Sequence, residues 1–374
     1  MPTRRPDDGS ASTSHLPEKD THMEKTAPPS TRRIVVITLL ILLGTQVFHF
    51  VYLHTRDVAI RLHDDQIDIQ RLSNAIARFI LEEGYGYRVV MVESTIKEVH
   101  ERLTEGDIDV TLEMWKDNNL AWYDLVSEKG EVVDLGPIYT GGRQYWIIPR
   151  WYAREKNITG VFQMKQHWRD FANPEDPSKG IFFNCIFGWS CRDINRVKLT
   201  AYGLDRYFNM VSPASPEALE AIYENARDRQ LPVFGYYWEP NALIASRDWV
   251  ALEEPPHSRD IWESIIQAAT DPHAPLPDKA CAFKEIGVHK LANRNLLEKA
   301  PDAARMLERM QIETRVFNEI LFTDTRKGLS SEDFRHMALR FFSTYPDLWE
   351  GWVTAAAGDR IKTALARIRE NKGN

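Results

Sequence analysis

The fold class is decided by residues 58–113, which read VAIRLHDDQIDIQRLSNAIARFILEEGYGYRVVMVESTIKEVHERLTEGDIDVTLE. Residues 58–62 and 107–113 alternate apolar and polar side chains as half-buried strands do, and 87–92 predicts another strand. The two stretches between them carry apolar residues at helical spacing, and Gly84 ends the first. This strand–helix–strand–helix–strand order predicts an α/β fold with a mostly parallel sheet and right-handed crossovers.

The rest of the chain continues this pattern and then becomes mainly helical. We expect further strands at 145–148 and 233–237, a loop-rich stretch at 157–180, and helices near 301–322, 330–344 and 359–371. The whole chain has 374 residues, of which 43% are hydrophobic, so it has room for two domains. A formal charge of −7 excludes general electrostatic binding of nucleic acid. Three cysteines are too few for a disulfide scaffold and lack the spacing of a structural zinc site.

The N-terminal part differs in composition from everything that follows. Residues 1–33 are polar and predict a disordered tail. Residues 34–53 contain no charged side chain, and at about 1.5 Å per residue they can span a hydrocarbon core roughly 30 Å thick. Arg32 and Arg33 precede this segment, which places the tail in the cytoplasm by the positive-inside rule. We therefore expect an uncleaved, single-pass signal anchor in the inner membrane.

Two alternatives to the anchor are a cleaved signal peptide and a buried soluble helix. No small-residue cleavage site follows the apolar run, and the first cysteine is Cys185, so a lipoprotein signal is absent. If translation starts at Met23, the tail is shorter and the topology is the same.

Three of the eleven tryptophans occupy corresponding positions in the predicted pattern. Trp115 and Trp238 each come at the end of a predicted strand, and Trp189 precedes a predicted helix. Ligands of open α/β sheets bind beyond the carboxyl ends of the strands. One such tryptophan, taken alone, is more simply explained as core packing. Three together, with Trp189 between Cys185 and Cys191, favour a binding site built from indole rings.

Four segments resemble the glycine betaine binding proteins of ABC importers. Residues 185–195, CIFGWSCRDIN, are similar to the Cys-x-x-Gly-Trp-Gly-Cys signature of that family, and residues 231–240, LPVFGYYWEP, resemble its strand that ends in Trp-x-Pro. Residues 105–115, EGDIDVTLEMW, resemble its first-domain motif, and residues 297–304 resemble the start of a late helix. The motifs follow the order of the family, and the similarity covers roughly residues 57–355.

The resemblance implies a two-lobed periplasmic-binding-protein fold of type II. Lobe I would comprise residues 57–141 and 243–374, and lobe II residues 142–242, with crossings near 141 and 243. The implied function is a membrane-anchored, extracytoplasmic solute-binding protein. It would capture a betaine-like quaternary ammonium compound and deliver it to the permease and ATPase subunits of an ABC importer. The alternative is a ligand-sensing receptor domain for the same ligand class, not coupled to transport.

An enzyme on this scaffold is a third hypothesis with little support. The sequence has no nucleophile elbow, Walker loop or metalloprotease motif, and its histidines are scattered. We therefore expect no catalytic residue, cofactor or metal ion. The acidic pair Asp64 and Asp65 follows the first strand, where capping of the next helix is a sufficient role.

The resemblance also implies which residues hold the ligand. Trp115, Trp189 and Trp238 would form a cage around the ammonium, which binds ring faces through cation–π contacts. The backbone N–H groups of Ser190 and Cys191, at a helix start, would hold the ligand's carboxylate.

The same resemblance implies a disulfide between Cys185 and Cys191 that fixes the loop carrying Trp189. An exterior domain is oxidising enough for such a bond, and two reduced, buried thiols are the alternative. Cys281 is expected to be a free, structural thiol.

Three positions depart from the family pattern. Ser190 stands where the family has glycine, and Asn119 stands where a family histidine helps to hold the carboxylate. Glu239 follows the last cage tryptophan where some members have threonine. A carboxylate there would favour choline-like cations or repel a ligand's own carboxylate, and a solvated loop residue is the alternative. Arg143 and Trp146 are weaker candidates for lining the cleft, with packing at the crossing as the alternative.

Overall fold

The computed structural model describes residues 58–171, 173–321 and 328–373, which belong to one compact unit. Their nine strands are β1 (Ala59–Asp64), β2 (Arg88–Glu93), β3 (Val110–Met114), β4 (Val132–Pro149), β5 (Gly180–Phe183), β6 (Phe208–Val211), β7 (Gly235–Glu239), β8 (Trp249–Ala251) and β9 (Ile286–Asn293). The order β2-β1-β3-β9-β4 forms the sheet of lobe I, and β4-β7-β5-β6 forms that of lobe II. Strand β8 pairs with β4 in lobe II.

The α/β pattern expected at the start of the chain is confirmed. Strand β1 pairs in parallel with β2 and β3. The intervening helices are α2 (Asp68–Phe79), continued by a π-helical segment at Ile80–Tyr85 (η1), and α3 (Ile96–Glu105). Helix α3 begins at a capping box, in which the Glu98 carboxylate accepts from the Thr95 N–H at 2.8 Å. Strand β9 lies antiparallel between β3 and β4, so the sheet of lobe I is mixed and not mostly parallel as expected.

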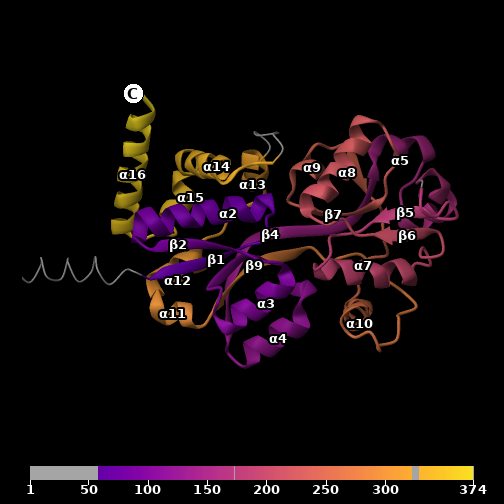
Figure 1. Cartoon of the computed structure of the whole chain (residues 1–374), viewed down its shortest axis with the longest axis horizontal. Helices are drawn as coiled ribbons and strands as arrows, with labels where there is room; N and C mark the ends of the chain where they lie inside the picture. The colour runs from indigo at the N-terminus through magenta and orange to yellow at the C-terminus, as the bar shows by residue number, and fades with distance from the viewer. Residues whose placement is uncertain (1–57, 172, 322–327, 374) are drawn as a thin grey trace, which may run out of the picture. The chain divides into compact units, whose positions relative to one another are not determined.

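Strand β4 carries the chain from lobe I into lobe II, as Figure 1 shows. Its first part pairs with β9 as far as Gly142, and its second part pairs with β7 from Arg143 onward. The first crossing therefore lies inside one continuous strand, beside the position near residue 141 that the sequence predicts.

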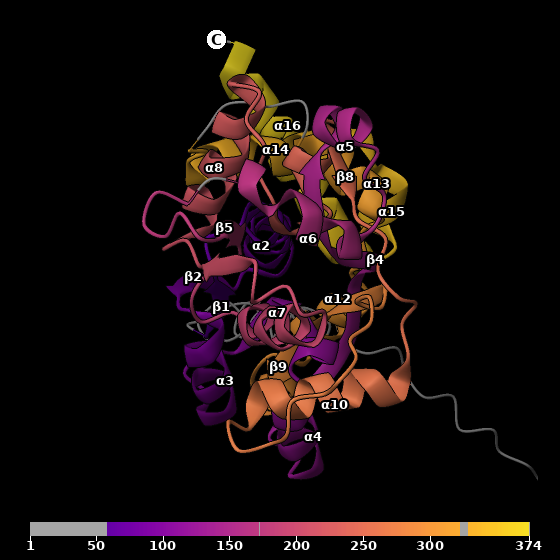
Figure 2. The ribbon, with the colours of Figure 1, turned by 90° about the vertical axis from the view of Figure 1, so that its right-hand side faces the viewer.

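The return crossing lies later than the expected position near residue 243. Strand β8 pairs with β4 in lobe II, and Trp249 and Phe283 belong to the core of that lobe. Helix α10 (Arg259–Thr270) lies beside α7 (Ser190–Ala201), as Figure 2 shows. The chain therefore returns just before β9 begins at Ile286. Helical periodicity marks α10 as amphipathic, but it does not say which sheet the helix covers.

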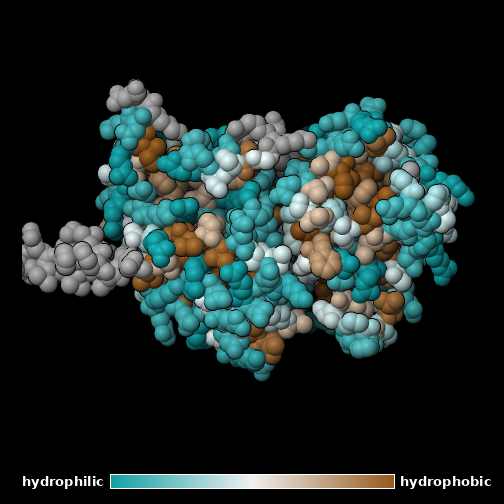
Figure 3. Space-filling view, viewed as in Figure 1, coloured by the Kyte–Doolittle hydropathy of each residue, from teal (hydrophilic) through white to brown (hydrophobic). Residues whose placement is uncertain are grey.

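The remaining helices cover the two sheets. In lobe I these are η2 (Lys116–Asn118), α4 (Leu120–Glu128), α11 (Asn295–Lys299), α12 (Pro301–Arg309), α13 (Thr314–Leu321), α14 (Ser331–Thr344), α15 (Pro346–Glu350) and α16 (Ala355–Gly373). In lobe II they are α5 (Arg150–Lys156), η3 (Val161–Gln163), α6 (Met164–His167), η4 (Trp168–Asp170), α8 (Pro216–Asp228) and α9 (Ala242–Ala245). Each lobe has its own main hydrophobic core, and the face in Figure 3 is mostly hydrophilic.

The helix expected near 301–322 is two helices, α12 and α13. Met310 leaves the helical conformation, and the N–H of Ile312 donates to the carbonyl of Ile138 in β4 at 2.8 Å. The short segment between the helices is thus fixed to the sheet of lobe I. The helices expected near 330–344 and 359–371 correspond to α14 and α16.

The expected tail at 1–33 and anchor at 34–53 lie outside the described residues. Within the described ranges, no helix is both long enough and apolar enough to cross a membrane.

Candidate ligand-binding site

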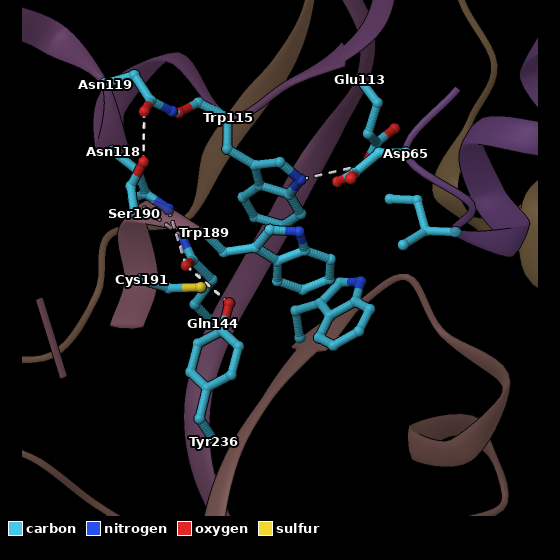
Figure 4. A pocket seen from close by; sticks show the side chains of 12 residues that line it. Asp65, Glu113, Trp115, Asn118, Asn119, Gln144, Trp189, Ser190, Cys191 and Tyr236 are labelled. Carbon is cyan, nitrogen blue, oxygen red and sulfur yellow. Dashed lines mark hydrogen bonds between the residues drawn. The ribbon is translucent and has the colours of Figure 1, made fainter. Parts of the chain in front are cut away.

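A pocket lies between the lobes, and residues from both lobes form its walls (Figure 4). The residues that line it are Asp65, Ile67, Glu113, Trp115, Asn118 and Asn119 from lobe I, and Gln144, Trp189, Ser190, Cys191, Tyr236 and Trp238 from lobe II. All of the ligand-binding residues expected from the sequence are here except Glu239.

The three candidate tryptophans converge in this pocket. Trp115 follows β3, Trp189 precedes α7, and Trp238 belongs to β7. The rings of Trp189 and Trp238 meet edge to face, with centroids 5.1 Å apart. Trp115 and Trp189 are partly buried and pack against the cores of both lobes. The indoles thus join the two halves of the molecule around one space.

A glycine at the crossing makes room for the Trp115 ring. A Cβ atom at Gly142 would lie 3.1 Å from that ring and 3.1 Å from the Val288 side chain. The ring is also held by its Nε1–H, which donates to Oε1 of Glu113 at 3.1 Å. Strand β4 therefore leaves room for the Trp115 ring at the point where the strand passes between the lobes.

The loop that carries Trp189 is closed by the expected disulfide between Cys185 and Cys191. Asn184 braces it further: its Oδ1 accepts from the Cys185 N–H at 2.8 Å, and its Nδ2 donates to the Arg192 carbonyl at 3.0 Å. Helix α7 begins directly after Trp189, and the first N–H groups of a helix have no partner within it. This loop therefore presents both an indole and a helix N-terminus to the pocket.

The third cysteine takes no part in the site. Cys281 is free and buried in the core of lobe II.

Amide and hydroxyl groups form one end of the pocket. Asn118 and Gln144 bond reciprocally across the lobes, with the Asn118 Nδ2 to Gln144 Oε1 bond at 2.9 Å and the return bond at 3.3 Å. The Tyr236 hydroxyl donates to Oε1 of Gln144 at 2.9 Å. The Ser190 hydroxyl donates to Oδ1 of Asn119, which makes a third hydrogen bond between the lobes. This end can offer polar contacts, but it contains no charged side chain among the lining residues.

Two carboxyl groups, Asp65 and Glu113, form the other end (Figure 4). Glu113 is 2% exposed, and its Oε1 accepts from Trp115 and from the Tyr139 hydroxyl. Its Oε2 is buried and has no hydrogen-bond partner within the described part of the chain. Burial raises the pKa of Glu113 to about 7. Burial also raises the pKa of Asp65 well above its ordinary value, and the nearby Trp189 indole opposes this shift.

Glu239 does not line the pocket, contrary to the sequence expectation. Successive residues of a strand face opposite sides, so Tyr236 and Trp238 share the pocket face of β7 while Glu239 faces away. Its carboxylate lies near Tyr145 instead, where burial first and then this carboxylate raise the pKa of Tyr145. The carboxylates of the site are therefore different residues from the one predicted.

The two weaker candidates also lie outside the pocket. Arg143 is exposed and pairs with Glu285 at 2.8 Å. Trp146 is fully buried in the core of lobe II, where its Nε1–H donates to Oδ1 of Asn195 at 2.8 Å. The alternative considered for both residues was packing at the crossing. Trp146 has such a packing role, whereas Arg143 is exposed.

Comparison with known proteins identifies the family. The family model described as the substrate binding domain of ABC-type glycine betaine transport systems matches residues 59–333, which is more than half of the chain. The chain belongs to this family. The sequence-based recognition is thus confirmed, and with it the two-lobed α/β fold of a solute-binding protein.

Solved structures of other binding proteins share this fold. A glycine betaine/L-proline-binding protein of an ABC transporter from Borrelia burgdorferi aligns with a TM-score of 0.65 at 16% identity, over 81% of this chain and 100% of its own. An ABC-transporter choline binding protein in complex with choline aligns with a TM-score of 0.65 at 18% identity, over 82% of this chain and 98% of its own. Lactococcal OpuAC, in its closed conformation with glycine betaine, aligns with a TM-score of 0.59 at 14% identity, over 80% of this chain and 100% of its own. At these identities the likeness shows the fold alone.

Proposed function

We propose that this chain captures a quaternary ammonium compound between its lobes and delivers it to the permease and ATPase subunits of an ABC importer. The observation that carries the proposal is the convergence of three indoles from both lobes on one pocket. A quaternary ammonium has no hydrogen to donate, so a protein binds it by placing its methyl groups against electron-rich ring faces. Trp115, Trp189 and Trp238 offer such faces.

The ends of the pocket give the ligand an orientation. The ammonium is attracted to the side of Asp65 and Glu113, and a polar tail reaches the amides and the start of α7. Because each lobe supplies part of the cage, the full set of contacts exists only when the lobes are close together. Ligand binding therefore favours the closed arrangement, which the permease would recognise.

The chain is further proposed to be anchored in the inner membrane through residues 34–53, with its binding domain outside the cytoplasm. The support is the uncharged twenty-residue run and the two arginines before it. We expect the protein to stay with the membrane fraction after an alkaline carbonate wash, and release into the supernatant would contradict the anchor. A variant with Leu39, Leu40 and Leu42 changed to arginine should appear in the soluble fraction.

The proposed function is tested by a thermal-shift screen of the full chain with choline, glycine betaine, carnitine and proline betaine. A ligand at a hundred times its Kd stabilises the folded state by about 2.7 kcal/mol if it binds only that state. We expect at least one compound to raise the Tm, while sodium chloride at equal ionic strength does not. No rise with any of the four would contradict the proposal.

A further inference from the structure

The ionisable side chains that line the pocket are all acidic. Among the described residues that line the pocket, two are carboxylic acids and none is lysine, arginine or histidine. A ligand's carboxylate would find only the first N–H groups of α7 and neutral side chains. A ligand's positive charge would be attracted by two carboxyl groups, those of Asp65 and Glu113.

Of the two acids, Glu113 gives the stronger reason to expect a cation in the pocket. Its side chain is almost fully buried, and Oε2 has no hydrogen-bond partner among the described residues. A buried acceptor without a partner is costly, and a buried carboxylate without a counter-charge is more so. Figure 4 shows Glu113 and Asp65 on the same side of the indoles. A cation in the cage would lie next to both groups.

Among the residues that the structure describes, the groups that face these acids supply no positive charge. Glu113 meets Trp115 and the Tyr139 hydroxyl of β4. Asp65 lies near the Trp189 indole. Three other carboxyl groups raise the pKa of Asp65 by charge repulsion, and they belong to Asp64 at the end of β1, Glu113 of β3 and Glu217 of α8. Two ionised carboxylates in such a place would repel each other, and this repulsion adds to burial in favouring the protonated form of the pair when no cation is bound.

We propose that Asp65 and Glu113 make the pocket select a net-cationic ligand over a zwitterion with the same ammonium group, and that the bound cation displaces a proton from the pair. This inference rests on the proposed function and names the substrate class within it. The exchange balances: one cation enters the pocket, and up to one proton leaves for the buffer.

The exchange fixes the sign of the pH dependence. Burial raises the pKa of Glu113 to about 7, and a neighbouring cation would lower it. Below that pKa the cation must first displace the proton, so affinity falls as the pH falls. If only this group titrates, the Kd for a cation should decrease about tenfold from pH 6 to pH 8 and level off above. Proton release per cation should be largest at pH 6 and should decrease toward pH 8.

The test is calorimetric titration of the full chain with choline chloride and with glycine betaine at pH 6, 7 and 8. Each titration is run in phosphate and in MOPS, which both take up protons between pH 6 and pH 8 and differ in heat of ionisation, so the difference in heat between these buffers counts the protons released. We expect choline to bind more tightly than betaine at pH 8, with the pH dependence given above. Equal or tighter binding of betaine, or choline binding without proton release, would overturn the inference. If neither ligand binds, the proposed function itself is contradicted.

A variant separates this role from a structural one. Glu113→Gln keeps an oxygen that can accept from Trp115 and Tyr139 but cannot ionise. It should abolish most of the proton release, flatten the dependence on pH and reduce the preference for choline. Glu332→Gln, an exposed carboxylate on α14, is the matched control and should change none of these. If Glu113→Gln keeps the wild-type proton release and the wild-type preference, the assignment of Glu113 is wrong.

Discussion

Replacing Trp189 with alanine should weaken binding of choline or glycine betaine about 30-fold or more while the chain keeps its fold. A desolvated cation–π contact contributes about 2 kcal/mol, which corresponds to a factor of about 30 in Kd. Trp189 is only partly buried and lies at the pocket between the two cores, so its removal leaves each core intact. Its ring also supports Trp238 through the edge-to-face contact.

Calorimetry measures the change in affinity, and far-UV circular dichroism with thermal melting checks the fold. Trp151→Ala is the matched control, because this indole lies on α5 of lobe II, is 36% exposed and does not line the pocket. It should leave the affinity unchanged. Trp189→Phe should retain part of the affinity, since a smaller aromatic face remains. A Trp189→Ala variant that binds as tightly as the wild type would remove this residue from the cage.

Local sequence patterns predict the first lobe well up to β3. Alternation marks β1 and β3, and helical spacing marks the helix between β1 and β2. The expected end at Gly84 is wrong, because the helical segment continues through Gly84 to Tyr85 and has Gly86 as its C-cap. These elements are short, regular and paired with neighbours in the same part of the chain, so local patterns contain most of the information.

The elements that join the lobes are harder to predict. Strand β4 runs through Gly136, Pro137 and Gly141, where its register with β9 shifts, and such residues usually indicate a turn. Strand β9 contains Lys290, which is fully buried and donates to the carbonyls of Pro137 and Met310. A lysine in a short sequence window predicts exposure, because its partners come from distant parts of the chain.

The sequence predicts the three indoles of the candidate site, but it misses the two acids and several other lining residues, which are Ile67, Asn118, Gln144 and Tyr236. The indoles and the disulfide loop carry a motif, whereas Glu113 looks like the polar side of a half-buried strand. Strand β3 is instead central, between β1 and β9, and is buried along its whole length, so its polar residue faces the pocket. Asp65 was expected to cap α2, but the helix has Ile67 at its N-cap and no side-chain cap. Both errors arise because burial depends on tertiary neighbours.

The second large effect concerns the ligand's charge. Choline and 3,3-dimethyl-1-butanol have the same shape and the same hydroxyl, but the second has a carbon in place of the ammonium nitrogen. An apolar pocket would bind both alike, because the hydrophobic contribution follows the apolar area removed from water. A cage of indoles beside two carboxyl groups distinguishes them, since cation–π and charge–charge attraction act only on choline.

Side-by-side calorimetric titration of the full chain at pH 8 with choline and with its neutral analogue tests the cage most directly. We predict that choline binds at least about 30-fold more tightly, which corresponds to about 2 kcal/mol of interaction with the positive charge. Equal affinity for the two compounds would contradict recognition of an ammonium group by Trp115, Trp189 and Trp238.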